Sequence, residues 1–229
     1  MQFVDEATYL AARLEVLQAE KELSKAKAAL AVKRAALPAV ALTKAYTLVD
    51  TAGADVSFAS LFSDGVEEVL VYHLMYDESD ATTCSLCCFF IDQFDGCAVH
   101  LPPKTKLIVV AKASATQLTA LKATKGWKLP VYSAGSSTFC EDMQVSFTSD
   151  QQERKCCTYN FNRTWDYGPN APGMSVFRRQ GDNVCKTYQT FAGGLGDVSL
   201  VHSLLDLTPS GRDEKDKGNM WWVKHKEAY

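Results

Sequence analysis

The stretch "VLVYHLMYDESDATTCSLCCFFIDQFDG", residues 69–96, decides the fold. Residues 69–75 form a nearly continuous apolar run, which is typical of a strand buried on both faces of a sheet. Residues 84–95 predict a helix that directly follows this strand, with Thr83 as its N-cap and Gly96 at its end. A buried strand that leads into a helix indicates a parallel βαβ unit, in which helices cover the sheet.

The elements on either side repeat this alternation. Ser114 and Gln117 form a capping-box pair, which predicts the start of a second helix, and Gly126 ends it. The remaining predicted elements are strands at 106–111 and 127–133, a long irregular region at about 135–171, a hairpin at 174–188 and a last helix from near residue 197. The order strand, helix, strand, helix, strand, loop, hairpin, helix predicts a three-layer α/β sandwich.

The N-terminal residues predict one long helix over 6–37, because they are rich in Ala, Leu, Glu and Lys, with Asp5 as N-cap and Pro38 as stop. Val16, Leu23, Leu30 and Leu37 recur at seven-residue spacing. We therefore expect a helical extension at 1–40 and a main domain at 41–229, with a C-terminal tail docked through Trp221 and Trp222. The narrow apolar stripe needs a surface to cover it, either the protein's own domain or a second copy in a homodimer; a partner-binding arm is the third alternative.

The composition excludes several functional classes. The chain has 229 residues, 47% of them hydrophobic and 22% charged, with a net charge of −3, which is unlike a basic nucleic-acid-binding protein. No apolar run reaches the roughly 20 residues that span a bilayer, and the first residues do not have the pattern of a secretory signal. Eight cysteines, four of them in two vicinal pairs, do not resemble a secreted disulfide scaffold. We expect free thiols in the cytoplasm or another reducing compartment.

Cys84 and Cys87 form a CxxC motif at the start of the predicted helix. The unpaired amides and partial positive charge of a helix N-terminus favour thiolate over thiol. Thioredoxin-like oxidoreductases have such a motif at a strand–helix junction. Their elements also have the order predicted here, a βαβ unit followed by a hairpin. We expect Cys84 to attack and Cys87 to resolve, while Cys88 packs in the interior.

Four other residues are candidates for substrate binding. Thr83 precedes the motif, and Pro172 stands just before the hairpin, where thioredoxin-like folds place a cis-proline, although an ordinary trans turn proline is the more frequent case. Phe139 and Trp165, in the irregular region, would form an aromatic lid over the cysteines. The alternative is that these aromatic residues only anchor a long loop.

A metal site is the competing interpretation. Cys84, Cys87, Cys97 and His100 have a spacing similar to that of zinc ligands. A helix over 84–95 would separate the two pairs by roughly 16–18 Å, which argues against a shared metal. A transition metal such as zinc or copper on His73 or His100 remains an alternative; otherwise the sequence predicts no cofactor. For His73 a hydrogen-bonded core position is favoured, and His202 and His225 are expected at the surface.

Several segments together resemble a known family. They are "LAARLEVLQAEKELSKAKAALAVKRAALP" (10–38), "LFSDGVEEVLVYHLMYDESDATTCSLCCFFIDQFDGCAVHL" (61–101), "GWKLPVYSAGSSTF" (126–139), "MSVFRRQGDNVCKTYQTFAGGL" (174–195) and "LDLTPSGRDE" (205–214). The chain resembles the thioredoxin-like family called domain of unknown function 899, which implies a thioredoxin-like fold with an N-terminal helical extension. Many members have proline–glycine between the two cysteines, where this chain has Ser85 and Leu86. A more distant resemblance is to peroxiredoxins, but the hydroxyl residue expected three positions before the cysteine is Ala81 here.

These observations predict a thiol–disulfide oxidoreductase that acts on a small-molecule or protein thiol or disulfide. The alternative is a metal-binding protein or a non-redox enzyme on the same fold, with His and Cys ligands. A third interpretation is a non-catalytic module that assembles through its N-terminal helix. No nucleic-acid or membrane partner is expected.

Overall fold

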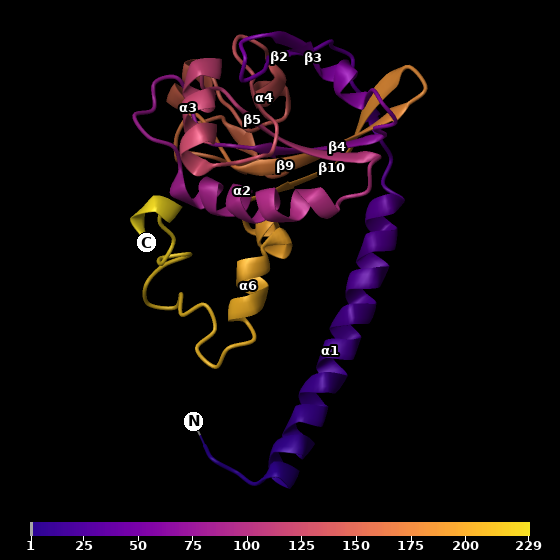
Figure 1. The fold of residues 1–229 in the computed structure, drawn as a ribbon, viewed down its shortest axis with the longest axis vertical. Helices are drawn as coiled ribbons and strands as arrows, with labels where there is room; N and C mark the ends of the chain where they lie inside the picture. The colour runs from indigo at the N-terminus through magenta and orange to yellow at the C-terminus, as the bar shows by residue number, and fades with distance from the viewer. Residues whose placement is uncertain (1) are drawn as a thin grey trace. The chain divides into compact units, whose positions relative to one another are not determined.

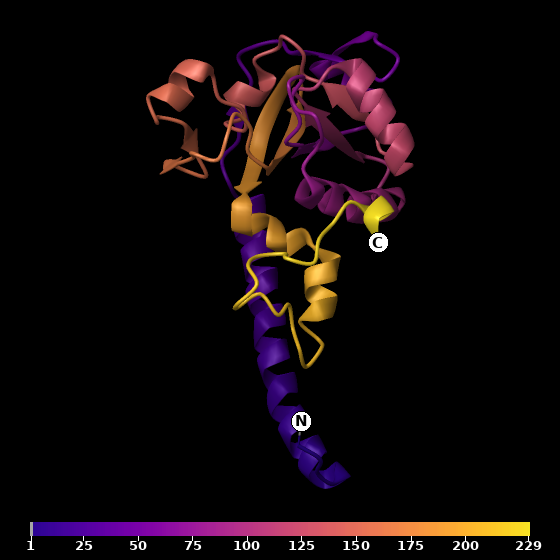
Figure 2. The same cartoon turned by 90° about the vertical axis from the view of Figure 1, so that its left-hand side faces the viewer.

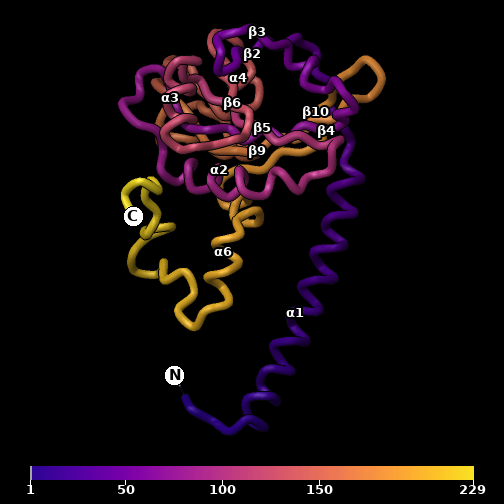
Figure 3. Tube along the Cα trace, viewed as in Figure 1, coloured from indigo at the N-terminus to yellow at the C-terminus, as the bar shows by residue number. Residues whose placement is uncertain are grey.

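The computed structural model describes residues 2–229 (Figures 1 and 3). It divides into two compact units, one up to Ala39 and one over Val40–Tyr229. Among the described helices, none is long and apolar enough to cross a membrane.

The N-terminal unit is the helix α1, Glu6–Ala35. It starts as expected, because the Asp5 carboxylate accepts a hydrogen bond from the Thr8 amide at 2.7 Å. It ends two residues earlier than expected and is followed by a turn before Pro38. No side chain of α1 is buried, and Val16, Leu23 and Leu30 are each 41–56% exposed.

The second unit is built on one large sheet. Its strands are β1 Val40–Ala41, β2 Thr47–Val49, β3 Asp55–Ser57, β4 Glu68–His73, β5 Thr105–Ala111, β6 Val131–Ser133, β9 Gly173–Gln180 and β10 Asn183–Phe191. They lie in the order β1, β10, β9, β4, β5, β6, β2, β3. β4, β5 and β6 are parallel, and the hairpin β9–β10 adds antiparallel strands beside β4 (Figure 1). This topology confirms the thioredoxin-like α/β fold predicted from the sequence.

The helices of this unit include those that the sequence predicts. They are α2 Ser85–Cys97, α3 Ala115–Lys125, α4 Phe139–Asp142, α5 Ser149–Glu153 and α6 Leu200–Leu205, with 3-10 turns η1 Phe58–Phe62, η2 Ala98–His100, η3 Ala192–Val198 and η4 Lys226–Ala228. The Ser114–Gln117 capping box is present, and Gly126 ends α3 with φ 67°. Two expectations for α2 are wrong: Cys84, not Thr83, is the N-cap, and the helix continues through Gly96.

The sheet separates two apolar clusters. Along β4, Val69 and Val71 pack into one cluster, while Tyr72 belongs to the other. The first cluster contains α4 and η1, and the second contains α2 (Figure 1). Because strand side chains alternate in direction, neighbours on β4 such as Tyr72 and His73 face different clusters.

The C-terminal segment returns to α2 and α3 (Figure 2). Lys226 Nζ lies 3.5 Å from the Asp92 carboxylate on α2. Lys125, only 4% exposed at the end of α3, donates to the Glu227 carboxylate at 2.6 Å. Met220 is buried in the α2 cluster, whereas Trp221 is 47% exposed.

Candidate functional site

Cys84 is the N-cap of α2 and is half-buried. Its Sγ accepts a hydrogen bond from the Cys87 backbone amide at 3.4 Å. A hydrogen bond with the Cys87 side chain, then the amides of Cys87 and Leu86, lower the pKa of Cys84 to about 6 against the opposing effect of burial. The thiolate is therefore favoured over the thiol near neutral pH.

The next two cysteines of the helix have different surroundings. Cys87 and Cys88 are each 1% exposed. The hydrogen bond with Cys84 and burial raise the pKa of Cys87 well above its usual range. Burial raises the pKa of Cys88 to about 12. All three thiols are free in this structure.

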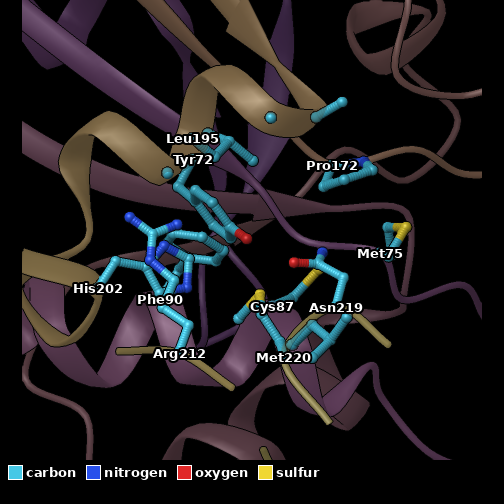
Figure 4. Close-up of a pocket in the computed structure, with 14 residues that line it drawn as sticks. Tyr72, Met75, Cys87, Phe90, Pro172, Leu195, His202, Arg212, Asn219 and Met220 are labelled. Atoms are coloured by element: carbon cyan, nitrogen blue, oxygen red, sulfur yellow. The ribbon is translucent and has the colours of Figure 1, made fainter. Parts of the chain in front are cut away.

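A cavity of about 270 Å³ lies on the buried side of Cys87 (Figure 4). It is lined by the end of β4, the first turns of α2, the segment from Ala192 through α6, and the chain after α6. Cys87 lines the cavity and Cys84 does not. The two sulfurs of the motif therefore face different environments.

His202 lies in this cavity wall, and the expectation that it is a surface residue is wrong. It is 4% exposed, and its ring contacts those of Phe89, Phe90 and Trp222 at centroid distances of 5.8–6.4 Å. Burial, followed by the nearby Arg212 charge, lowers its pKa below the usual range. The cause of the error is the C-terminal segment: Trp222 covers the histidine, and the short helix α6 gives no periodic pattern from which its buried face could be predicted.

Buried polar atoms face the same cavity. Tyr72 is fully buried, and its hydroxyl is directed at the thiol of Cys87, a weak hydrogen-bond acceptor. Both ring nitrogens of His202 are buried without a hydrogen-bond partner among the described residues. Figure 4 shows the Tyr72 hydroxyl pointing toward Cys87. Burial, then the adjacent Cys87, raise the pKa of Tyr72 well above its ordinary value, so the phenol stays protonated. The strand alternation, which places Tyr72 on the α2 face, is the sequence signal that could have identified it.

Of the four residues predicted to bind substrate, Pro172 lies in the cavity wall. The peptide bond before it is trans. The Tyr159 hydroxyl donates to the Pro172 carbonyl at 2.5 Å and accepts from the Ala192 amide at 2.9 Å, which links two cavity-lining residues. Thr83 is buried beside Cys88 and does not line the cavity.

Phe139 and Trp165 do not form a lid over the cysteines. Phe139 is fully buried in the cluster on the opposite face of the sheet, where it packs against Tyr46, Phe58 and Phe177. Trp165 packs on the same cluster, and neither residue lines the cavity. The physical reason is that α4 follows β6 onto the face away from α2. The irregular region also contains a small hairpin, β7 Thr158–Tyr159 with β8 Arg163–Thr164.

The two histidines considered as metal ligands are far apart along the sheet. His73 ends β4 opposite Val110, whereas His100 is an exposed residue that precedes the start of β5 at Thr105. The His73 ring donates to or accepts from Ser175 Oγ at 2.8 Å, as expected for a core histidine. Over residues 2–229, no group of three or more His, Cys, Asp or Glu side chains is arranged to hold a metal. Cys84 caps the start of α2 and Cys97 is the last of its 13 residues, in agreement with the argument against a shared zinc.

Comparison of the structure with solved structures finds peroxiredoxins at low sequence identity. Peroxidoxin BcpB from Mycobacterium tuberculosis is 13% identical, with 62% of this chain and 77% of that chain covered and a TM-score of 0.44. Xanthomonas campestris peroxiredoxin Q is 13% identical, with 68% and 85% covered and a TM-score of 0.47. A peroxiredoxin-like protein from Aquifex aeolicus is 11% identical, with 68% and 75% covered and a TM-score of 0.45.

No curated protein matches this sequence. The model of one family, described as "Bacterial protein of unknown function (DUF899)", matches residues 1–229. This match covers the whole chain and includes every segment from which the family resemblance was drawn. The chain therefore belongs to the DUF899 family.

Proposed function

We propose that the protein is a thiol–disulfide oxidoreductase in which Cys84 attacks and Cys87 resolves. The observation that carries this proposal is the position of Cys84 Sγ at the N-terminus of α2, where it is partly buried and accepts a hydrogen bond from the Cys87 amide. A thiolate held by helix-end amides is both nucleophilic and a good leaving group. Its partner lies one helical turn away, close enough to form a disulfide.

The reaction needs a disulfide substrate. The Cys84 thiolate attacks one sulfur of the substrate, whose S–S bond breaks, and the first half leaves as a thiolate that takes a proton from water. Cys87 then loses its proton to solvent and attacks Cys84 Sγ, which releases the second half as a thiol. The substrate is reduced to two thiols, and the two cysteines are oxidised to a disulfide. A dithiol reductant would return them to the starting state.

The pKa of Cys87 fits this order. In the reduced protein its pKa is raised chiefly by the hydrogen bond with Cys84. Once Cys84 is in a mixed disulfide, its negative charge is gone and this cause disappears. The first step thus removes the larger of the two causes that keep the resolving thiol protonated, while burial still opposes the thiolate.

The substrate is a small-molecule or protein disulfide that reaches the exposed side of Cys84. The cycle requires a compartment where thiols stay reduced, such as the cytoplasm, because eight free cysteines would otherwise cross-link.

Trapping the mixed disulfide tests the proposal. Cys97 and Cys156 are exposed thiols, so both are first changed to serine to remove background reaction. In that protein the added variant Cys87→Ser, incubated with bis(2-hydroxyethyl) disulfide, is expected to accumulate a mercaptoethanol adduct on Cys84 alone by mass spectrometry. Intact Cys87 should convert the adduct to an internal disulfide with loss of two hydrogens. An absence of adduct at residue 84 would rule out the proposal.

We also propose that α1 pairs with a second copy of itself. Val16, Leu23 and Leu30 keep the seven-residue spacing of helix pairing within α1 and are 41–56% exposed. The change Leu23→Glu places a charge in this stripe and should lower the sedimentation coefficient of the full chain. Val32→Glu, at a position outside the spacing and 69% exposed, is the matched control and should have no effect. Equal behaviour of the two variants would refute the pairing.

A further inference from the structure

The cavity beside Cys87 contains polar atoms that require partners. The two ring nitrogens of His202 are buried without a hydrogen bond from the described residues, and the buried hydroxyl of Tyr72 has only the weakly accepting Cys87 thiol beside it. Burial of such a group without a partner costs about 1–3 kcal/mol, so native proteins rarely retain it without a function. Both side chains line the same cavity, together with Arg212 (Figure 4).

The donors at this end of the cavity favour an acceptor with negative charge. Arg212 is the one charged side chain among the described residues that line it. Its Nε and Nη2 donate to the Asp206 carboxylate at 2.8 and 2.6 Å, which fixes the plane of the guanidinium and leaves Nη1 for a ligand. The protonated phenol of Tyr72 is a donor, and the neutral ring of His202 supplies one donor and one acceptor.

Asp206 and Glu214 limit the strength of this preference. Both carboxylates lie near enough to raise the pKa of Arg212, so they offset part of its positive charge. We therefore expect a selectivity of about tenfold for an anion over its neutral analogue, which corresponds to about 1.4 kcal/mol.

The rest of the cavity is apolar. Phe90, Leu195 and Met220 are buried in its wall, and Met75 and Leu86 complete the surface. Methionine side chains adapt to different ligand shapes. The volume of about 270 Å³ is just below the roughly 300–1,000 Å³ of pockets for drug-sized molecules, so the ligand is a short chain or a single ring.

We propose that this cavity binds a small organic carboxylic acid, with its carboxylate on Tyr72, His202 and Arg212 and its apolar part against Phe90, Leu195 and Met220. Cys87, the resolving thiol of the proposed function, lines this cavity, whereas Cys84 does not. The carboxylate site therefore adjoins the resolving cysteine, and it is tested independently of the attack by Cys84.

Calorimetric titration of the full chain with three ring compounds of similar size tests this site. Benzoate is expected to bind about tenfold more tightly than benzyl alcohol, and benzylamine more weakly than either. The variant Arg212→Gln should weaken benzoate about tenfold and leave benzyl alcohol unchanged. Arg178→Gln removes an arginine that lies 3.7 Å from Glu67 and Glu68 on the sheet and should change neither.

The variant Tyr72→Phe gives a second test. It is expected to fold as the parent protein does, because it keeps the buried ring and removes only the phenolic hydroxyl. It should weaken benzoate severalfold without loss of the folded circular dichroism spectrum. Cys84→Ser should bind benzoate as the parent protein does, so a failed redox proposal would leave this result intact. Failure of all three compounds to bind, equal affinity for benzoate and benzyl alcohol, or an unchanged affinity in Arg212→Gln would each overturn the proposal.

Discussion

Three thiols within one turn of α2 have different surroundings, and the difference decides which of them can react. Cys84 is only partly buried and is bonded to a backbone amide, whereas Cys87 and Cys88 are buried. Burial disfavours the charged thiolate, and amide donors favour it. The same residue type thus gives a nucleophile at one position and two protonated thiols at the others.

Cys88 is expected to have a packing role only. The change Cys88→Ala removes one buried sulfur and should lower the free energy of unfolding by roughly 1–2 kcal/mol, as for other small losses of core volume. Urea denaturation measures this effect. The pH dependence of Cys84 alkylation should not change in the variant; a shifted profile would show that Cys88 takes part in the chemistry.

For single residues, the sequence predicts which cysteines form the motif but not which side chains line the cavity beside them. Cys84 and Cys87 are identified by spacing at a strand–helix junction, which is local information. His202 and Arg212 join the site only because the chain after β10 returns over α2, a tertiary contact that no local pattern shows. The position of Phe139 also depends on a tertiary contact, because α4 follows β6 onto the face of the sheet away from α2.

The first turn of α2 shows how one element serves both stability and reactivity. Cys84 caps the helix through its sulfur, and serine is a better cap than cysteine because its hydroxyl accepts amide hydrogen bonds well. We predict that Cys84→Ser keeps the stability of the parent protein, while Cys84→Ala lowers the free energy of unfolding by about 1 kcal/mol. Both variants should lose the reactive thiol. If the two unfold at the same urea concentration, the cap contributes nothing.

The C-terminal segment forms one wall of the cavity and is held by an ion pair between a buried lysine and a glutamate whose side chain is 41% exposed. Lys125 is 4% exposed, and its ammonium group donates to Glu227. The change Glu227→Gln removes the negative partner and leaves a buried cation poorly compensated, which should loosen the segment. We predict a severalfold faster reaction of Cys87 with iodoacetamide, measured by peptide mass mapping in a Cys84→Ser background.

A matched variant controls for the loss of a charge. Asp150 forms an exposed ion pair with Arg154 on α5, where both side chains are 70% exposed. Asp150→Asn should therefore leave the reaction of Cys87 unchanged. If Glu227→Gln behaves in the same way, the segment is not held by this pair.

For the whole molecule, the order of the large elements is predictable and the small ones are not. Apolar runs identify β4 and β5, and capping residues identify α3, because these signals lie within the elements themselves. The short strands β1, β2 and β3 and the short helices α4 and α5 have two to five residues each, too few for a periodic pattern. Their conformations depend on packing against the sheet.

The buried histidines predict how stability changes with pH. Burial lowers the pKa of His73 to about 3, from an unfolded value of 6.5. The unfolded chain then binds more protons between these values, so stability falls as the pH falls through this window, by up to about 1.4 kcal/mol per pH unit for one histidine. His202, whose pKa is also lowered, acts in the same direction.

Replacement of His73 isolates its share of this effect. We predict that His73→Gln reduces the slope of unfolding free energy against pH between about 6 and 4, as measured by urea denaturation at several pH values. His100→Gln, which changes an exposed histidine, should keep the parent slope. Equal slopes in the two variants would show that His73 titrates normally.

The alkylation rate of Cys84 as a function of pH tests the central claim most directly. With Cys97 and Cys156 changed to serine, the iodoacetamide reaction at Cys84 should rise to half its maximum near pH 6 and disappear in Cys84→Ser. A midpoint near pH 9, the value of an ordinary thiol, would contradict the claim that the start of α2 activates this sulfur.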